Sequence, residues 1–229
     1  MELDTVQRMR HVFFRLTGTT SDDPALTEMG EDTNEVVDIY LTRGARAAQR
    51  WMLRMGYGGW RQRSSAITWS GADDTDGGRY AALPSDFLRS FGSSRVSALV
   101  EADGDRWGTE IRPDEEQLRG DFYYIRGEQL WITRDASPPS TVYHEYHYEH
   151  PEFDGLADGS IDFPMEARPL IVAEAADAAK EENWLPGDRM MELKIARSLQ
   201  RAREEARHIA RPTNQPRRMR APARHGNRW

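Results

Sequence analysis

The chain has 229 residues, of which 38% are hydrophobic and 30% are charged, and its formal charge is −7. This size predicts a folded body with a core, and no apolar run approaches the roughly 18 residues of a membrane span. The absence of cysteine excludes disulfides, thiolate metal sites and cysteine nucleophiles. Glu2 and Asp4 stand where a signal peptide would be basic and apolar, so we expect a soluble protein made in the cytoplasm.

Two amphipathic helices are predicted at the start of the chain. Residues 3–17 repeat apolar side chains at steps of three and four and end near Gly18. A second helix, capped by Asp32 or Thr33, runs to the glycines that begin at Gly56. The predicted buried positions are Leu3, Val6, Met9, Phe13 and Leu16, and then Val37, Leu41, Ala48, Trp51 or Met52, and Met55.

A small antiparallel β subdomain is predicted from Trp60 to about Glu149. There the helical period gives way to short runs of β-branched and aromatic residues between turn residues. The expected strands are 61–70, 79–83, 95–101, 122–126, 129–134 and 141–149, with a tight turn at Gly127-Glu128. Residues 71–78 hold three aspartates between glycines and are predicted to form an acidic loop.

Two further helices are predicted after a loop at 151–159. Pro164 can begin an alanine-rich helix whose small side chains would let a neighbouring helix approach closely. Residues 183–187 then break the chain, and Asp188 can cap a last helix. Its narrow apolar stripe is Met191, Ile195, Leu199, Ala202, Ala206 and Ile209. We interpret its charged residues as a solvated surface, namely Arg197, Arg201, Arg203, Glu204, Glu205 and Arg207.

The clustered histidines are the main candidate for a metal site. However, side chains alternate along a strand, so His144 and His147 would point to opposite faces, and His150 follows three residues later. The chain also has no phosphate-binding loop, nucleophile elbow or zinc-protease helix motif. Carboxylate pairs such as Glu181-Glu182 lie in polar surroundings that need no catalytic explanation. We therefore predict no enzyme, no cofactor and no metal site.

The last nineteen residues reverse the charge of the chain. Six of the 31 basic residues and none of the 38 acidic residues lie in 211–229, so this arm carries +6 and residues 1–210 carry −13. Pro212, Pro216 and Pro222 favour an extended arm. It could neutralise up to about six phosphates of a nucleic acid. It could instead lie in a protein groove, where arginine and tryptophan are favoured contact residues, or be a disordered tail.

These elements predict an α+β protein with an insertion. Residues 1–59 and 160–210 would form a helical core of two N-terminal and two C-terminal helices. Residues 60–159 would form the inserted antiparallel β subdomain, and 211–229 the extended C-terminal arm.

Several segments resemble the head-to-tail adaptor (connector) proteins that bind beneath the portal in tailed bacteriophages and gene transfer agents. Ala-Leu-Pro-Ser-Asp-Phe-Leu at 82–88 is similar to their strand-to-turn motif, and Phe-Tyr-Tyr-Ile-Arg-Gly-Glu-Gln-Leu-Trp-Ile at 122–132 to their hairpin. The strand at 143–148 follows. Phe163-Pro164, which opens an alanine-rich helix, and a last helix rich in Glu and Arg complete the order over roughly residues 3–210.

The resemblance implies a non-catalytic virion protein of the phage neck, assembled in the host cytoplasm. Such adaptors form a ring, usually of twelve copies, that joins the portal protein to a tail component such as a nozzle, stopper or tail tube. DNA passes through the ring during ejection without sequence-specific binding. No contact with a membrane is expected.

The resemblance also suggests which residues make contacts. The arm would dock on the portal through Arg211, Arg217, Arg218, Arg220, Arg224 and Trp229. The acidic loop would meet a tail component through Asp73, Asp74 and Asp76. The alternative function is a nucleic-acid-binding protein that uses the arginine-rich tail.

Overall fold

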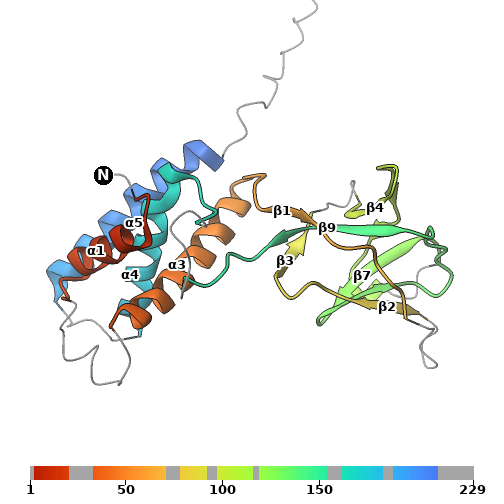
Figure 1. Ribbon diagram of the computed structural model, residues 1–229, viewed down its shortest axis with the longest axis horizontal. Helices are drawn as coiled ribbons and strands as arrows, with labels where there is room; N and C mark the ends of the chain where they lie inside the picture. Colours follow the sequence, from red (N-terminus) through yellow and green to blue (C-terminus); the bar gives the residue numbers. More distant parts are fainter. Residues whose placement is uncertain are drawn as a thin grey trace, which may run out of the picture. The chain divides into compact units, whose positions relative to one another are not determined.

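The chain folds into two compact units (Figure 1). The computed structural model describes residues 3–20, 33–70, 78–91, 97–115, 119–153, 161–182 and 188–210. The helical unit comprises Met1–Gly58 and Phe153–Trp229, and the β unit comprises Gly59–Glu152. The predicted α+β class is confirmed, with four α-helices within the described ranges. The chain rejoins the helical unit before residue 160, and the N–H of Phe153 donates to Thr42 Oγ1 at 2.9 Å.

Helix α1 (Val6–Thr17) has the predicted face and the predicted end. Its first turn is capped by Thr5 Oγ1, which accepts a hydrogen bond from the N–H of Arg8 at 3.1 Å. Gly18 ends the helix at a φ of 72°, a left-handed conformation that glycine adopts without strain. All five predicted apolar positions are buried, namely Leu3, Val6, Met9, Phe13 and Leu16.

Helices α3 (Thr33–Arg54) and α4 (Arg168–Glu181) approach each other closely at Gly44. A Cβ atom at Gly44 would lie 2.3 Å from the carbonyl oxygen of Ile171 and 2.7 Å from the backbone nitrogen of Ala175. The alanine-rich sequence of α4 therefore does permit the close helix contact that it predicts. A 3₁₀ turn, η3 (Met165–Ala167), precedes α4.

Helix α4 lies among the other helices of its unit and contacts α1, α3 and α5 (Figure 1). Helix α5 (Arg189–Ala210) begins as predicted, since Asp188 Oδ1 accepts a hydrogen bond from the N–H of Met190 at 2.9 Å. Its predicted stripe is buried from Met191 to Ala206, and Ile209 is half-buried. Because α4 is covered on several sides, its central residues are almost all buried.

Arg168 joins the start of the chain to the segment before α4. Its guanidinium donates to the carbonyl oxygens of Leu3 at 3.0 Å, Ile161 at 3.0 Å and Phe163 at 3.1 Å. One side chain thus satisfies three backbone acceptors outside the helices.

The β unit contains two sheets. The first has the strand order β1-β9-β4-β5, with β3 also paired to β9, and the second has the order β2-β8-β7-β6. The pairs are antiparallel except for β6 with β7, which is parallel. The strands are β1 (Arg61–Arg63), β2 (Arg79–Ala82), β3 (Phe87–Ser90), β4 (Leu99–Glu101), β5 (Arg106–Trp107), β6 (Thr109–Glu110), β7 (Phe122–Arg126), β8 (Gln129–Ile132) and β9 (Val142–Tyr148). A 3₁₀ turn, η1 (Pro113–Glu115), follows β6.

The strand predictions differ from the structure where strands are short or irregular. The prediction of a strand over 61–70 is wrong beyond Arg63, although the N–H groups of Ser64 and Ile67 still bond to carbonyls of β9. The two bonded residues are three positions apart in this segment, but their acceptors on β9, His144 and Val142, are only two positions apart. The regular pairing of the two strands therefore ends after Arg63. Three short strands, β3, β5 and β6, were not predicted. The turn at Gly127-Glu128 is confirmed, with Gly127 at a φ of 61°.

The core of the β unit lies between its two sheets. The first sheet contributes Leu99 and Val142, and the second contributes Tyr123, Leu130 and Ile132. The hydroxyl of Tyr123 accepts a hydrogen bond from the N–H of Ala98 at 2.8 Å. The inward side of β9 is therefore fixed by the core, and its other side faces outward.

Candidate functional site

The residues predicted to dock on other proteins lie outside the described residues. This applies to the arm, with Arg211, Arg217, Arg218, Arg220, Arg224 and Trp229, and to the acidic loop, with Asp73, Asp74 and Asp76. Both therefore stay predictions.

Strand β9 carries a polar sequence into the middle of the β unit. Its alternation places Val142, His144 and Tyr146 on the inward side and Tyr143, Glu145 and His147 on the outward side. The predicted separation of His144 and His147 onto opposite faces follows from this strand. Nδ1 of His147 lies 3.0 Å from the carbonyl oxygen of Gly59. Across the described ranges, no group of three or more His, Asp or Glu side chains could hold a metal ion.

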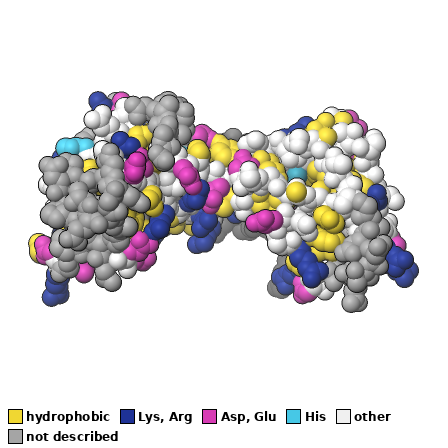
Figure 2. All heavy atoms as spheres, turned by 60° about the horizontal axis from the view of Figure 1, so that its bottom comes forward, with side chains coloured by type: hydrophobic (Ala, Val, Ile, Leu, Met, Phe, Trp, Pro, Cys, Tyr) yellow, Lys and Arg dark blue, Asp and Glu magenta, His cyan; other side chains and the backbone are white. Residues whose placement is uncertain are grey.

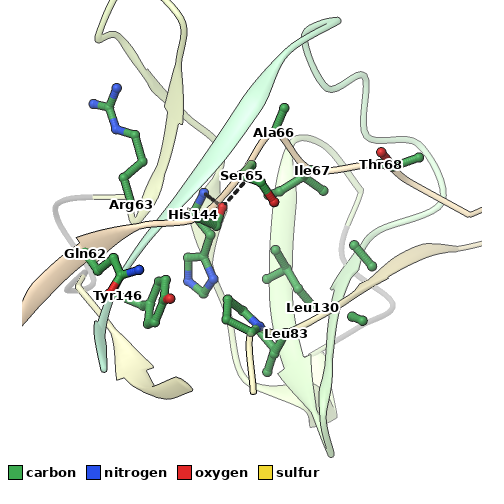
Figure 3. A pocket seen from close by; sticks show the side chains of 14 residues that line it. Gln62, Arg63, Ser65, Ala66, Ile67, Thr68, Leu83, Leu130, His144 and Tyr146 are labelled. Atoms are coloured by element: carbon green, nitrogen blue, oxygen red, sulfur yellow. Dashed lines mark hydrogen bonds between the residues drawn. The ribbon is translucent and has the colours of Figure 1, made fainter. Parts of the chain in front are cut away.

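On its inward side, β9 forms the floor of a groove of about 460 Å³ (Figure 3). The walls come from residues 62–68, which begin in β1 and continue past its end, and from residues 81–84 at the end of β2. Figure 3 shows His144, Tyr146 and Leu130 pointing into this space, with Ile67 and Leu83 beside them. The lining thus mixes apolar side chains with polar ones, which include Gln62, Ser65 and Thr68 beside the imidazole.

His144 is almost completely buried in this floor. Its Nε2 lies 3.0 Å from Ser90 Oγ, and its ring stacks on Phe87 at a centroid distance of 5.5 Å. Burial lowers the pKa of His144 from 6.5 to about 4, so the ring is neutral at pH 7. Its Nδ1 has no hydrogen-bond partner in the described part of the chain.

The contact between Ser90 and His144 does not form a catalytic triad. A triad needs a third group that orients the second ring nitrogen, and no described residue bonds Nδ1. The low pKa also makes His144 a weak base. Nearby, the Tyr146 hydroxyl donates to Asp86 Oδ1 at 2.9 Å, and burial together with this bond raises the pKa of Tyr146 to about 12. Neither the Ser90–His144 contact nor the Tyr146–Asp86 contact therefore provides a group poised to transfer a proton at pH 7.

On its outward side, β9 carries a carboxylate surrounded by arginines. Glu145 Oε2 accepts from Arg61 and lies 2.7 Å from an Arg106 nitrogen, and Oε1 lies 3.5 Å from an Arg63 nitrogen. The register explains the grouping, because Arg63 pairs with Glu145 and Arg61 with His147 on the adjacent strand. We call Arg61, Arg63 and Arg106 the arginine face.

Aromatic rings hold two of these guanidinium groups in place. The guanidinium carbon of Arg61 lies 3.9 Å from the ring centroid of Phe91, and that of Arg63 lies 5.5 Å from that of Tyr143. Burial opposes the charge of Glu145, but Arg61 and Arg106 lower its pKa overall. One carboxylate thus neutralises one of three positive charges, and the face keeps a net charge of about +2.

The helical unit presents a mixed charged surface with a local apolar exception. Figure 2 shows acidic and basic side chains interspersed over this unit. At the start of α5, Met190 is 72% exposed and Leu193 is 44% exposed. They border a shallow pocket of about 700 Å³ whose wall includes Leu16 and Gly18 of the α1 end. Exposed apolar side chains grouped in this way are typical of an interaction surface.

Charged residues of the helical unit also have internal roles that the sequence did not reveal. Arg203, interpreted as part of a solvated surface, donates from two nitrogens to Glu174 Oε1 at 3.0 and 2.8 Å. Burial raises the pKa of Glu174, which is 9% exposed. Arg10 pairs with the buried carboxylate of Asp38. These pairs join helices and are better explained as structural contacts than as a site.

The arginine face was missed because its members are far apart in the sequence. Arg61 and Glu145 are separated by 84 positions, and only the strand pairing brings them together. One signal was present, since Arg61 and Arg63 are two residues apart in a predicted strand and must share a face.

Comparisons with protein families and with curated proteins add no relative to these observations. No protein-family model matches the chain, and no curated protein matches its sequence. None of the helices within the described ranges is sufficiently long and apolar to span a membrane.

Proposed function

We propose that this protein is a non-catalytic structural adaptor that forms a ring between a phage portal and a tail. In this proposal the ring, of about twelve copies by the resemblance, surrounds the DNA channel, and the C-terminal arm docks on the portal. The β unit contacts the next tail component.

The order of elements carries the proposal. Two helices, an inserted β unit and two further helices occur in the sequence order on which the resemblance to the adaptors rests. The segment 82–88 runs from β2 through a turn, in which the N–H of Phe87 donates to the Pro84 carbonyl at 3.0 Å, into β3. The segment 122–132 is the β7–β8 hairpin. These local forms agree with the strand-to-turn and hairpin motifs, which supports the proposal.

The surface of the helical unit also suits a subunit of a ring. Copies in a ring bury part of their surface against neighbours, and such surfaces contain exposed apolar side chains. Met190 and Leu193 provide such a patch at the start of α5. Elsewhere in this unit, the backbone contact at Gly44 and the Arg203–Glu174 pair join helices, so the patch belongs to a firmly packed unit.

Electron microscopy of the chain mixed with the portal protein of the same virus tests the proposal. We expect rings seated on the portal, and we expect a chain that ends at Ala210 to lose this seating. A full-length variant with Arg217, Arg218, Arg220 and Arg224 changed to lysine serves as the matched control, because it keeps the charge but loses the planar donor fork. If no ring forms on the portal with the full chain, the proposal is wrong. If the shortened chain seats equally well, the arm is not the docking segment.

The alternative function, nucleic-acid binding through the arm, predicts a different result. Six arginines that each contact a phosphate would give a strongly salt-dependent affinity for duplex DNA, with a slope near −0.9 per contact. Filter retention of duplex DNA at several salt concentrations measures that slope. Strong retention that disappears in the chain ending at Ala210 would favour this alternative over the adaptor.

A further inference from the structure

Strand β1 is an edge strand whose outer side is open. It stands first in the order β1-β9-β4-β5, and its residues Arg61, Gln62 and Arg63 are all exposed. Within the described ranges it pairs with β9 alone. The open side of an edge strand offers backbone N–H and C=O groups to which a further strand can pair.

The backbone of Arg63 has no hydrogen-bond partner on β9. Arg63 lies opposite Glu145 in the ladder. However, the Glu145 N–H donates to the Ala98 carbonyl at 2.8 Å, and the Glu145 carbonyl accepts from the Phe91 N–H at 2.9 Å. Both of these bonds lie on the side of β9 that pairs with β3 and β4, away from β1. The N–H and C=O of Arg63 therefore point outward from the sheet edge.

The backbone of Arg61 points outward for the same reason. Bonded and unbonded pairs alternate along an antiparallel ladder. The bonded positions of this segment are Trp60, whose carbonyl accepts from the Tyr148 N–H at 3.1 Å, and Ser64, whose N–H donates to a carbonyl of β9 at 2.9 Å. Both arginines lie at the alternate positions between these two. Strand β1 thus presents the N–H and C=O of both arginines to a further strand.

The side chains of the same two residues give this edge a positive charge. The side chains of Arg61 and Arg63 are 39% and 45% exposed and share the carboxylate of Glu145. Arg63 lies 3.5 Å from it, which is long for a hydrogen bond, so the described residues leave most of the Arg63 N–H donors unused. Arg106 follows Asp105 on the far side of β9 and adds little charge to the edge.

The opposite side of β1 has no charged side chain. Side chains alternate along a strand, so Gln62 lies on that side, at the rim of the groove that His144 and Tyr146 line. The imidazole of His144 is neutral at pH 7. Figure 3 shows Arg63 pointing away from this groove. A strand added beside β1 would therefore place alternate side chains next to the arginines and next to the uncharged rim.

These features favour an acidic strand over a second copy of β1. Two copies of β1 side by side would bring arginines next to arginines, and like charges opposite each other destabilise a sheet. Acidic side chains would instead pair with Arg61 and Arg63. We propose that an extended segment of a partner protein, with acidic residues at every second position and uncharged residues between them, adds to β1 as a further strand. The inference deepens the proposed function and rests on it for assigning this segment to the tail component.

Two synthetic peptides test this recognition on the full chain. The probe is acetyl-Ser-Val-Glu-Val-Glu-Val-Ser-amide. The matched control, acetyl-Ser-Val-Val-Glu-Glu-Val-Ser-amide, has the same composition and charge but places its glutamates on opposite faces of a strand. Fluorescence anisotropy of the labelled peptides at low salt measures both affinities. We expect the control to bind about tenfold more weakly than the probe.

Backbone pairing is tested separately from the attraction of charges. A probe N-methylated at both glutamates keeps its charge but cannot donate to the carbonyls of β1, and we expect it to bind about tenfold more weakly. The unmodified probe should slow the hydrogen exchange of the Arg61 and Arg63 amides, measured by NMR.

A single substitution tests the charge of the edge. The variant Arg63→Gln should bind the probe about fivefold more weakly, because one cross-strand charge pair is lost. Arg134→Gln changes an exposed arginine that follows β8 and is the matched control. It should bind the probe like the natural chain.

The outcomes separate this inference from the proposed function. Equal binding of the two peptides, or binding that leaves the amides of β1 unprotected, would overturn strand addition. If rings form on the portal but the probe does not bind, the inference is wrong and the adaptor function stands. If the probe binds as expected and no ring forms, strand addition stands and the adaptor function falls. If a single-stranded oligothymidylate binds more tightly than the probe and Arg63→Gln weakens that binding, the arginines form a phosphate site and the inference is wrong.

Discussion

The helical unit and the β unit are stabilised in different ways. The helical unit depends on backbone proximity, since α3 and α4 meet where Gly44 leaves no room for a side chain. The β unit instead places an imidazole and a carboxylate, His144 and Glu145, at adjacent buried positions of β9. The first arrangement is insensitive to protonation, and the second depends on it. The comparison teaches that a change of shape should damage the α3–α4 contact and that a change of pH should damage the surroundings of β9.

The largest expected effect is the substitution Gly44→Ala. The new Cβ would meet backbone atoms of Ile171 and Ala175, which cannot move aside as a flexible side chain can. We expect a loss of roughly 3 kcal/mol in the free energy of unfolding, independent of pH between 5 and 8, measured by urea denaturation at 222 nm. Gly58→Ala is the control, because a Cβ there meets no atom within 4 Å. A stable Gly44→Ala variant would show that α3 and α4 can separate without cost.

Protonation of His144 should be the next largest effect, and it should act on the β unit. The folded state keeps this imidazole neutral down to about pH 4, whereas the unfolded chain binds a proton below about pH 6.5. Stability conferred by the neutral ring is therefore complete above pH 6.5 and is lost as the pH falls to 4. The expected loss is about 3 kcal/mol over that range.

Hydrogen exchange of β9 amides at several pH values measures this loss. The difference between the natural chain and His144→Gln isolates the histidine from other groups that titrate in the same range. His208→Gln, at an exposed position of α5, is the control for the loss of an imidazole outside the β unit. Equal pH dependence in the natural chain and in His144→Gln would contradict the role of His144.

A smaller effect is expected from Arg168→Met, which tests how far the helical unit also relies on a charged side chain. The variant keeps much of the aliphatic stem but leaves the carbonyls of Leu3, Ile161 and Phe163 without their donor. We expect a loss of roughly 2 kcal/mol in unfolding free energy and faster amide exchange at the start of α1. Arg207→Met, at an exposed position of α5, should change stability by only a few tenths of a kcal/mol.

The smallest expected effect is local to α1. Thr5→Ala removes the oxygen that accepts from the Arg8 N–H and should cost about 1 kcal/mol, as judged by the thermal unfolding midpoint. Thr5→Ser retains that oxygen and should behave like the natural chain. If the alanine and serine variants unfold at the same temperature, the cap does not contribute.

The helical unit could be predicted in most of its detail because its pattern is local, although Met55, predicted to be buried, is 38% exposed. The four-residue step from Met9 to Phe13 is sufficient to predict the buried face of α1. Asp188 is sufficient to predict the start of α5. The β unit could be predicted only in outline. Strands as short as β5 and β6 have two residues each, which cannot display an alternation, and the pairing of Arg61 with β9 joins distant parts of the chain.

The candidate surfaces were less predictable than the fold. An arginine that contacts solvent and one that pairs with a buried acid look alike in a sequence, as Arg203 demonstrates with Glu174. The same ambiguity applies to Arg106, whose partner Glu145 lies in a different strand. Only the sheet register decides which charges gather on one face.

The ends of the β unit are paired with each other, which bears on how such an insertion could be exchanged. The chain enters through β1 and leaves after β9, and these strands are neighbours, with Arg61 opposite His147 and the Tyr148 N–H donating to the Trp60 carbonyl at 3.1 Å. The insertion therefore begins and ends on two paired strands of the same sheet. Recombination that replaced everything between β1 and β9 would give the helices a new module while keeping both junctions, so the helical unit could acquire different contacts without being rebuilt.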